Sequence, residues 1–229
     1  MKYKSQIEKV IKKLLSGRKQ PKSKSRKINI YINGLYGKFE NTEYALNKIK
    51  EITQESEPSG FYTQEINPEV HFYVDSFFAF LYSCLDVLAQ VLNQNYKDLN
   101  KLKLDERQIS FKGILYKIKK ENLRLPINVE LKNIVSGNYF KNLDKYRNCS
   151  THRHQIYIKK EQNTISETAG YTTSTGELPI VQWIICDDPF GFDGETKKPP
   201  IKQRRDLYKY SEQMYKNIKR KIDNIVNIL

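Results

Sequence analysis

The stretch Asn67–Asn93, NPEVHFYVDSFFAFLYSCLDVLAQVLN, sets the architecture of this chain. Its spacing predicts a helix of about seven turns that is apolar over much of its circumference, as the central helix of a bundle should be. Asn67 can cap the free amides, Pro68 suits the first helical position, and Glu69 complements the positive end of the helix dipole. The apolar residues that recur at steps of three and four are Val70, Val74, Phe77, Leu81, Cys84, Leu88 and Leu92.

Helical spacing recurs on both sides of this stretch. Arg18–Lys27 is basic and contains Pro21, which indicates a loop or linker, with a phosphate-binding arm as the alternative. Ile28, Ile30 and Ile32 alternate before Asn33-Gly34, which predicts a β-hairpin. Between Gln155 and Cys186 apolar residues alternate with polar ones, so we expect a hairpin or small sheet there, and a loop over Asp187–Pro200. The further predicted helices are Lys2–Leu15, Asn41–Glu55, Asp105–Lys120, Pro126–Ile134, Asn138 to about His154, and Leu207–Leu229.

The fold class that follows is mainly α: a helical bundle with a β-hairpin or small-sheet insertion before the last helix. A chain of 229 residues is long enough for one domain with a sizeable core. We expect residues 1–229 to form that single domain. Its N-terminal extension would cover about 1–66, its bundle core about 67–154 and 200–229, and its β-rich insertion and loop about 155–199.

The charge and the cysteines bear on partners and compartment. A formal net charge of +14 favours a polyanionic partner, and nucleic acid is the usual one. The same lysine-rich, asparagine-rich usage also fits an A+T-rich genome, so the charge alone leaves both interpretations open. No apolar run of about 18 residues and no secretory leader is recognisable, so we expect no membrane partner. Cys84, Cys149 and Cys186 have no paired spacing, which favours reduced thiols and a cytoplasmic location.

One short segment carries chemistry: Arg147-Asn148-Cys149-Ser150-Thr151-His152. Arg147 and His152 are five residues apart, which is about 140° around a helix axis. A long arginine side chain can still curl towards the same groove as the imidazole. The segment therefore offers a fixed cation, an amide and a group that titrates near neutrality. Metal-free RNA cleavage needs these groups, because the 2′-hydroxyl of the RNA is the nucleophile and the protein supplies acid–base groups and positive charge.

Arg147, Asn148 and His152 resemble the R-x4–6-H signature of HEPN ribonucleases, at its shortest spacing. The resemblance implies an α-helical bundle that dimerises, so that two copies of the motif face one cleft. It also implies a metal-independent endoribonuclease in which His152 is the general acid or base and Arg147 stabilises the phosphate. Defence and toxin–antitoxin settings, with an inhibitory partner such as an antitoxin, are part of what it implies. Lys141, Lys145 and Arg153 are the expected RNA-binding residues beside the motif.

The chain departs from the family pattern at two places. Toxins silenced by a nucleotidyltransferase carry a tyrosine two residues after the histidine, whereas position 154 is His here, so that regulation is not carried over. The β-rich insertion lies outside the minimal fold and indicates an elaborated or divergent subfamily. The alternative function is a catalytically inactive HEPN-like module that binds RNA or a protein.

Other ionisable residues are weighed against the motif. Asp75 and Asp86 belong to a polar strip on the central helix, which either faces solvent or lines a cleft where they would orient Arg147 or His152. Cys149, His152 and His154 lack a second ligand pair for zinc. The acidic residues after position 186 lack the alternation that a calcium loop needs. We therefore expect no metal and no cofactor.

Overall fold

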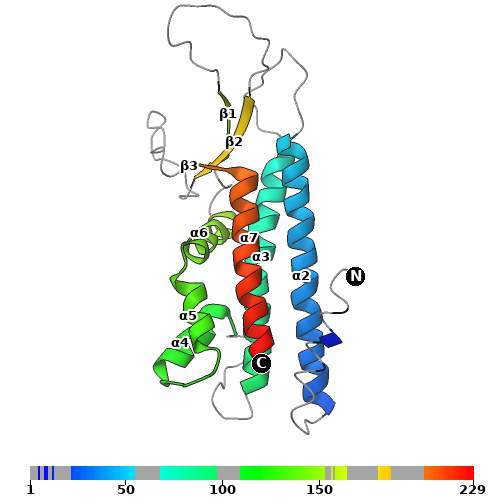
Figure 1. The fold of residues 1–229 in the computed structure, drawn as a ribbon, viewed down its shortest axis with the longest axis vertical. Helices are drawn as coiled ribbons and strands as arrows, with labels where there is room; N and C mark the ends of the chain where they lie inside the picture. Colours follow the sequence, from blue (N-terminus) through cyan, green and yellow to red (C-terminus); the bar gives the residue numbers. More distant parts are fainter. Residues whose placement is uncertain are drawn as a thin grey trace, which may run out of the picture.

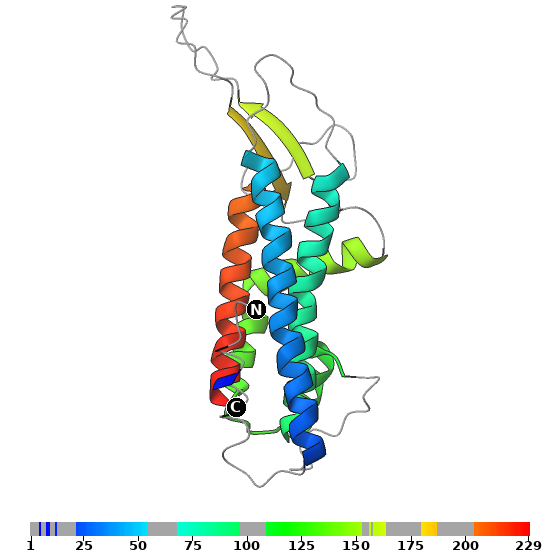
Figure 2. The ribbon, with the colours of Figure 1, turned by 90° about the vertical axis from the view of Figure 1, so that its right-hand side faces the viewer.

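The computed structural model describes residues 5, 8, 9, 12, 22–54, 68–96, 109–152, 156, 158–163, 180–186 and 204–229. The long helices α2 (Lys22–Gln54), α3 (Pro68–Tyr96) and α7 (Leu207–Ile228) lie side by side, as the two views in Figures 1 and 2 agree. The short helices α4 (Phe111–Lys120) and α5 (Asn128–Ser136) lie against one side of this group. Helix α6 (Asn138–His152) runs across the long helices in Figure 2.

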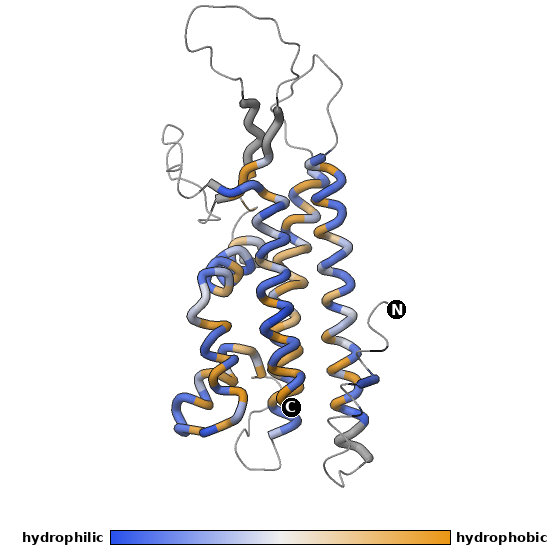
Figure 3. The backbone as a smooth tube through the Cα atoms, in the orientation of Figure 1, coloured by the Kyte–Doolittle hydropathy of each residue, from blue (hydrophilic) through white to orange (hydrophobic). Residues whose placement is uncertain are grey.

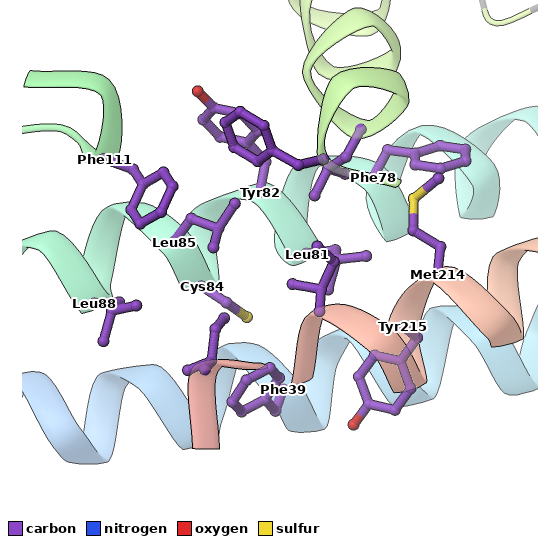
Figure 4. Packing of buried hydrophobic residues seen from close by; sticks show 14 of the residues in the cluster. Phe39, Phe78, Leu81, Tyr82, Cys84, Leu85, Leu88, Phe111, Met214 and Tyr215 are labelled. Carbon is purple, nitrogen blue, oxygen red and sulfur yellow. The ribbon is translucent and has the colours of Figure 1, made fainter. Parts of the chain in front are cut away.

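The predicted central helix is confirmed as α3, which extends slightly beyond Asn93. Its apolar side chains meet those of α2 and α7 in one core, and Figure 4 shows Met214 of α7 reaching towards Phe78 of α3. In Figure 3 the apolar residues of the long helices alternate with polar ones, as expected for helices with one buried face. The capping residue proposed for α3, Asn67, lies outside the described residues.

Helix α2 corrects the expectation of a linker and a hairpin before residue 41. Residues 22–54 form one continuous helix, so the predicted loop over residues 22–27 and the hairpin at Asn33-Gly34 are wrong. Ile28 and Ile32 are one helical turn apart and fully buried, whereas Ile30 is 58% exposed. The apparent strand alternation therefore came from two isoleucines on the buried face and one on the opposite face. Helix α2 packs along α3, so it lies inside the bundle instead of forming an extension to it.

Gly34 lies on the side of α2 that faces α3. A Cβ at this position would lie 3.9 Å from Cγ1 of Val87 on α3, which is an ordinary contact distance. The predicted helix over Asn41–Glu55 is confirmed as the second half of α2. The prediction for Lys2–Leu15 and the start of the basic stretch fall largely outside the described residues.

The shorter helices begin and end at recognisable signals. Helix α4 begins at Phe111, later than expected, because the Ser110 hydroxyl accepts a hydrogen bond of 3.0 Å from the Gly113 amide and so caps the helix there. Residues 97–108, which precede this helix, lie outside the described part. Gly137 separates α5 from α6 as predicted. Helix α7 begins after Asp206, whose carboxylate accepts a hydrogen bond of 2.8 Å from the Lys209 amide.

The β-rich insertion contributes an antiparallel sheet of order β1-β2-β3 at one end of the bundle (Figure 1). Strand β1 (Ile158–Asn163) pairs with β2 (Ile180–Cys186), with Ile158 opposite Ile185. The third strand, β3 (Arg204–Asp206), was not predicted and leads directly into α7. The loop expected over Asp187–Pro200 lies outside the described residues.

Helix α3 is long and apolar enough to cross a membrane by length and composition, which the sequence reading did not anticipate. Its position argues against that use, because it packs against α2, α4, α6 and α7. Half of its apolar 18-residue stretch is buried inside the protein. The central helix of a soluble helical bundle can be equally long and apolar. The apolar character of α3 is therefore accounted for by its place in the core.

Candidate functional site

Helix α6 is seated on α3 by one apolar face. Phe140, Leu143, Tyr146 and Cys149 on that face are buried. Tyr146 stacks on Phe78 of α3, with ring centroids 4.3 Å apart and an interplanar angle of 24°. Burial of such rings stabilises the contact between the two helices. Because Tyr146 is locked against α3, the next residue, Arg147, has a fixed direction.

Arg147 is half-buried and held by two side chains. Its guanidinium carbon lies 5.1 Å from the centre of the Tyr82 ring of α3, within the range of a cation–π contact. Its Nη1 donates a hydrogen bond of 3.1 Å to Oδ1 of Asn148. The amide that matches the family motif therefore orients the motif arginine itself.

Asp86 brings negative charge towards Arg147 and links it to α4. Burial raises the pKa of the Asp86 carboxyl, while a hydrogen bond from the Phe111 amide and the positive charge of Arg147 both lower it. The Phe111 amide lies 3.1 Å from Asp86 Oδ1. Asp86 therefore fixes the start of α4, and its carboxyl lies close enough to Arg147 to interact electrostatically with the motif arginine.

A second polar chain runs beneath the arginine. The Tyr82 hydroxyl hydrogen-bonds to the side chain of Asp144, and burial, the largest cause, raises the pKa of Tyr82. The Asp144 carboxylate in turn accepts a hydrogen bond of 2.8 Å from Lys112 Nζ. The Tyr82 ring, which stacks on Arg147, is thereby fixed through its hydroxyl group.

Asp75, the other candidate carboxylate, acts elsewhere in the structure. Burial raises its pKa and a hydrogen bond from the backbone of Ile156 lowers it. His71, one turn earlier on α3, also hydrogen-bonds to the Ile156 backbone, and burial lowers its pKa. The two side chains therefore bind the backbone of Ile156, which follows α6. Asp75 has a structural role at this place.

Of the remaining predicted site residues, the structure describes the side chains of two lysines on α6 but not those of His152 and Arg153. Lys141 and Lys145 are exposed on α6, on the same helix as Arg147. Helix α6 ends at His152, but the side chain of His152 and the whole of Arg153 lie outside the described part of the structure. Within the described ranges, no group of three or more His, Cys, Asp or Glu side chains could hold a metal ion.

Tyr82 and Asp144 are the residues whose roles the sequence did not indicate. Tyr82 appeared only as a member of the polar strip, although its spacing of one turn from Asp86 places both on the same face of α3. Asp144 lies one turn before Arg147 on α6, so both side chains point to the same neighbour. This spacing was the available signal, and a tyrosine in a helical core is more often packing than function.

A family comparison agrees with this geometry. The model of the Cthe2314-like HEPN family matches residues 47–178, which is more than half of the chain. This protein belongs to the HEPN superfamily. The match covers the last quarter of α2, all of α3 to α6, and β1, so it includes both the Arg147 motif and the helix that carries Tyr82 and Asp86. Searches of the curated proteins and of the solved structures gave no match.

Proposed function

We propose that this HEPN protein is a metal-independent endoribonuclease that uses Arg147 and His152. The observation that carries the proposal is the fixed guanidinium of Arg147, stacked on Tyr82 and hydrogen-bonded to Asn148 within the R-x4-H spacing of a HEPN chain. A guanidinium presents several donors in a planar fork that suits phosphate oxygens. Preorganised positive charge of this kind stabilises the charge that develops in the transition state.

The reaction follows from the RNA's own nucleophile. The 2′-oxygen attacks the adjacent phosphorus and loses its proton to a base, and the bond from phosphorus to the 5′-oxygen breaks. The departing 5′-oxygen takes a proton, which leaves a 2′,3′-cyclic phosphate and a 5′-hydroxyl. We assign acid–base transfer to His152, whose imidazole titrates near neutrality, and charge stabilisation to Arg147. Lys141 and Lys145 would hold the neighbouring phosphates.

The biological setting proposed here rests on the family alone. HEPN ribonucleases serve defence and toxin–antitoxin systems, so we propose such a role in the cytoplasm, with an inhibitory partner. The competing function is an inactive HEPN module that binds RNA without cutting it. Arg147 would serve that function equally, since a guanidinium binds a phosphate whether or not a bond breaks.

Cleavage of RNA in excess chelator tests the proposal. Arg147→Ala and His152→Ala should each lower the cleavage rate by on the order of 10² to 10⁴, because each removes a group that acts in the transition state. The products should end in cyclic phosphate. Lys145→Ala is the matched control on the same helix and should raise KM more than it lowers kcat. If wild-type protein retains RNA in a gel shift and leaves it intact, the binding module is the correct function.

A further inference from the structure

The outer face of α7 carries a row of basic and amide side chains. The helix buries Leu207, Met214, Ile218, Ile222 and Ile225 on one side. On the other side, exposed positions follow steps of three and four residues, and not one of them is acidic. The α7 row, as we call it, consists of Lys209, Gln213, Lys216, Arg220, Asn224 and Asn227.

The acidic residues of the same segment lie outside the row, although one of them, Glu212, pairs with a lysine of the row. Asp206 caps the start of the helix, and Asp223 pairs with Lys219. Glu212 lies 2.9 Å from Lys216 and hydrogen-bonds to Tyr208. Within the row, Lys216 and Arg220 are one turn apart, and like charges at that spacing repel, so an anion on this face would offset the repulsion.

The α7 row adjoins the motif helix. Gln213 in the middle of the row is 3.2 Å from the Tyr139 hydroxyl of α6, and Asn142 of α6 donates a hydrogen bond of 2.7 Å to the Tyr210 hydroxyl. Along the helix axis, Lys209 lies about 6 Å to one side of Gln213 and Arg220 about 10 Å to the other. A strand that left the motif helix at Tyr139 would meet cations in either direction.

We propose that the α7 row is a second RNA-binding surface, which holds the sugar–phosphate backbone of the substrate beyond the cleavage point. This deepens the ribonuclease function proposed above and rests on RNA being the substrate. Lysine and arginine bind phosphate oxygens, and amides bind phosphate oxygens and sugar hydroxyls, so both residue types of the row suit a nucleic-acid backbone. Contacts of this kind position a strand without reading its sequence. We therefore expect the affinity for RNA to depend on the length of the strand more than on its sequence.

Two triple variants with the same loss of charge test this surface. The first is Lys209→Gln/Lys216→Gln/Arg220→Gln in the α7 row. The second, the matched control, is Lys119→Gln/Lys120→Gln/Arg124→Gln at the end of α4, where the three cations are also exposed. Each variant removes two lysines and one arginine, and substitutions at exposed positions change stability little. Thermal melts of both variants confirm that they are folded.

The probe is a single-stranded 2′-O-methyl RNA of 20 nucleotides, which lacks the nucleophilic hydroxyl and so reports binding without cleavage. The row variant should bind it on the order of tenfold more weakly than wild type, and the slope of log K against log salt should fall by about 2. The α4 variant should match wild type closely. Equal weakening by both variants, or no weakening by the row variant, would overturn the proposal.

A cleavage measurement separates this proposal from the ribonuclease function. On a cleavable trinucleotide, too short to reach the row from the motif, the row variant should equal wild type. On a cleavable 20-nucleotide RNA its KM should rise while kcat stays the same. Loss of kcat on the trinucleotide would instead show that the row acts at the reaction centre, against the proposal. If wild-type protein cuts neither substrate, the ribonuclease function fails, while the binding comparison still tests the row.

Discussion

At the residue scale, the motif arginine is defined less by its own helix than by the helix beneath it. Tyr82 of α3 offers its ring to the guanidinium, and Asp144 and Lys112 hold the hydroxyl end of that ring. A long side chain in water loses rotamer entropy when it is held in one place. Contacts already made in the free protein remove that cost from the reaction, which is the physical basis of preorganisation.

Tyr82 therefore offers a test in two steps. Tyr82→Phe keeps the ring under Arg147 and loses the hydrogen bond to Asp144, so we expect about 0.5–1.5 kcal/mol of lost stability and a nearly unchanged kcat. Tyr82→Leu removes the aromatic face, and the lost cation–π contact, worth about 0.5–2 kcal/mol, should lower kcat by about 2- to 30-fold. Steady-state kinetics and thermal melts on both variants measure the two effects separately. Equal kcat in the two variants would show that the ring does not position the arginine.

How far the site could be predicted also depends on individual residues. The spacing of Arg147, Asn148 and His152 was visible, because a motif within one helix is a local pattern. The place of Asp86 beside Arg147 was open, since the sequence does not say which helices cross. Tyr82 and Asp144 gained their roles from that crossing. Contacts between distant segments are set by packing, which a single sequence does not display.

At the scale of the elements, local propensity and helical burial compete, and α2 shows which one prevails. Asn33-Gly34 is a hairpin signal, and a glycine inside a helix costs about 1 kcal/mol. Against this, Ile28, Ile32 and Leu35 are fully buried on the face of α2 that packs into the bundle. Burying each such side chain contributes about 1.5–3 kcal/mol, so the helix wins. Helices α3 and α7 were predictable because no turn signal interrupts their spacing.

The two isoleucines on opposite faces of α2 give the matching prediction. Ile32→Ala should lower the free energy of unfolding by about 2–5 kcal/mol, because it removes fully buried methyl groups from the core. Ile30→Ala, at a side chain that is 58% exposed, should change it by under about 0.5 kcal/mol. Equilibrium unfolding in urea measures both. In a hairpin, neighbours two residues apart would share a face, and the two substitutions would then cost the same.

At the scale of the whole molecule, the bundle brings the motif helix, the β-rich end and the basic face of α7 into one unit. The sheet that precedes α7 ends in β3, which runs directly into the helix, and α6 is joined to α7 by hydrogen bonds from Asn142 and Tyr139. The charge of +14 is thus organised in part on two neighbouring helices. Both helices were predicted from their apolar spacing, and the net charge follows from the composition. That α6 and α7 lie in contact was seen only in the structure.

The reaction itself argues for more than one copy of this molecule. Transesterification of RNA needs a base at the 2′-oxygen and an acid at the 5′-oxygen, on opposite sides of the phosphorus, and each motif supplies one imidazole. Two copies of α6 related by a twofold axis would supply both groups and two guanidinium ions. We therefore predict a homodimer, with a mass in solution twice the 27.1 kDa of one chain. Light scattering and sedimentation measure that mass directly.

Measuring the specific activity at increasing dilution tests whether the dimer is the active form. Below the dissociation constant of the dimer, the specific activity per chain should fall in step with the fraction of dimer, because a lone motif lacks one of the two proton-transfer groups. The Tyr82→Phe variant, whose change lies between α3 and α6, is the control and should dissociate at the same concentration as wild type. A monomer whose specific activity is unchanged on dilution would show that one chain holds a complete site, with a second proton-transfer group that belongs to the same copy.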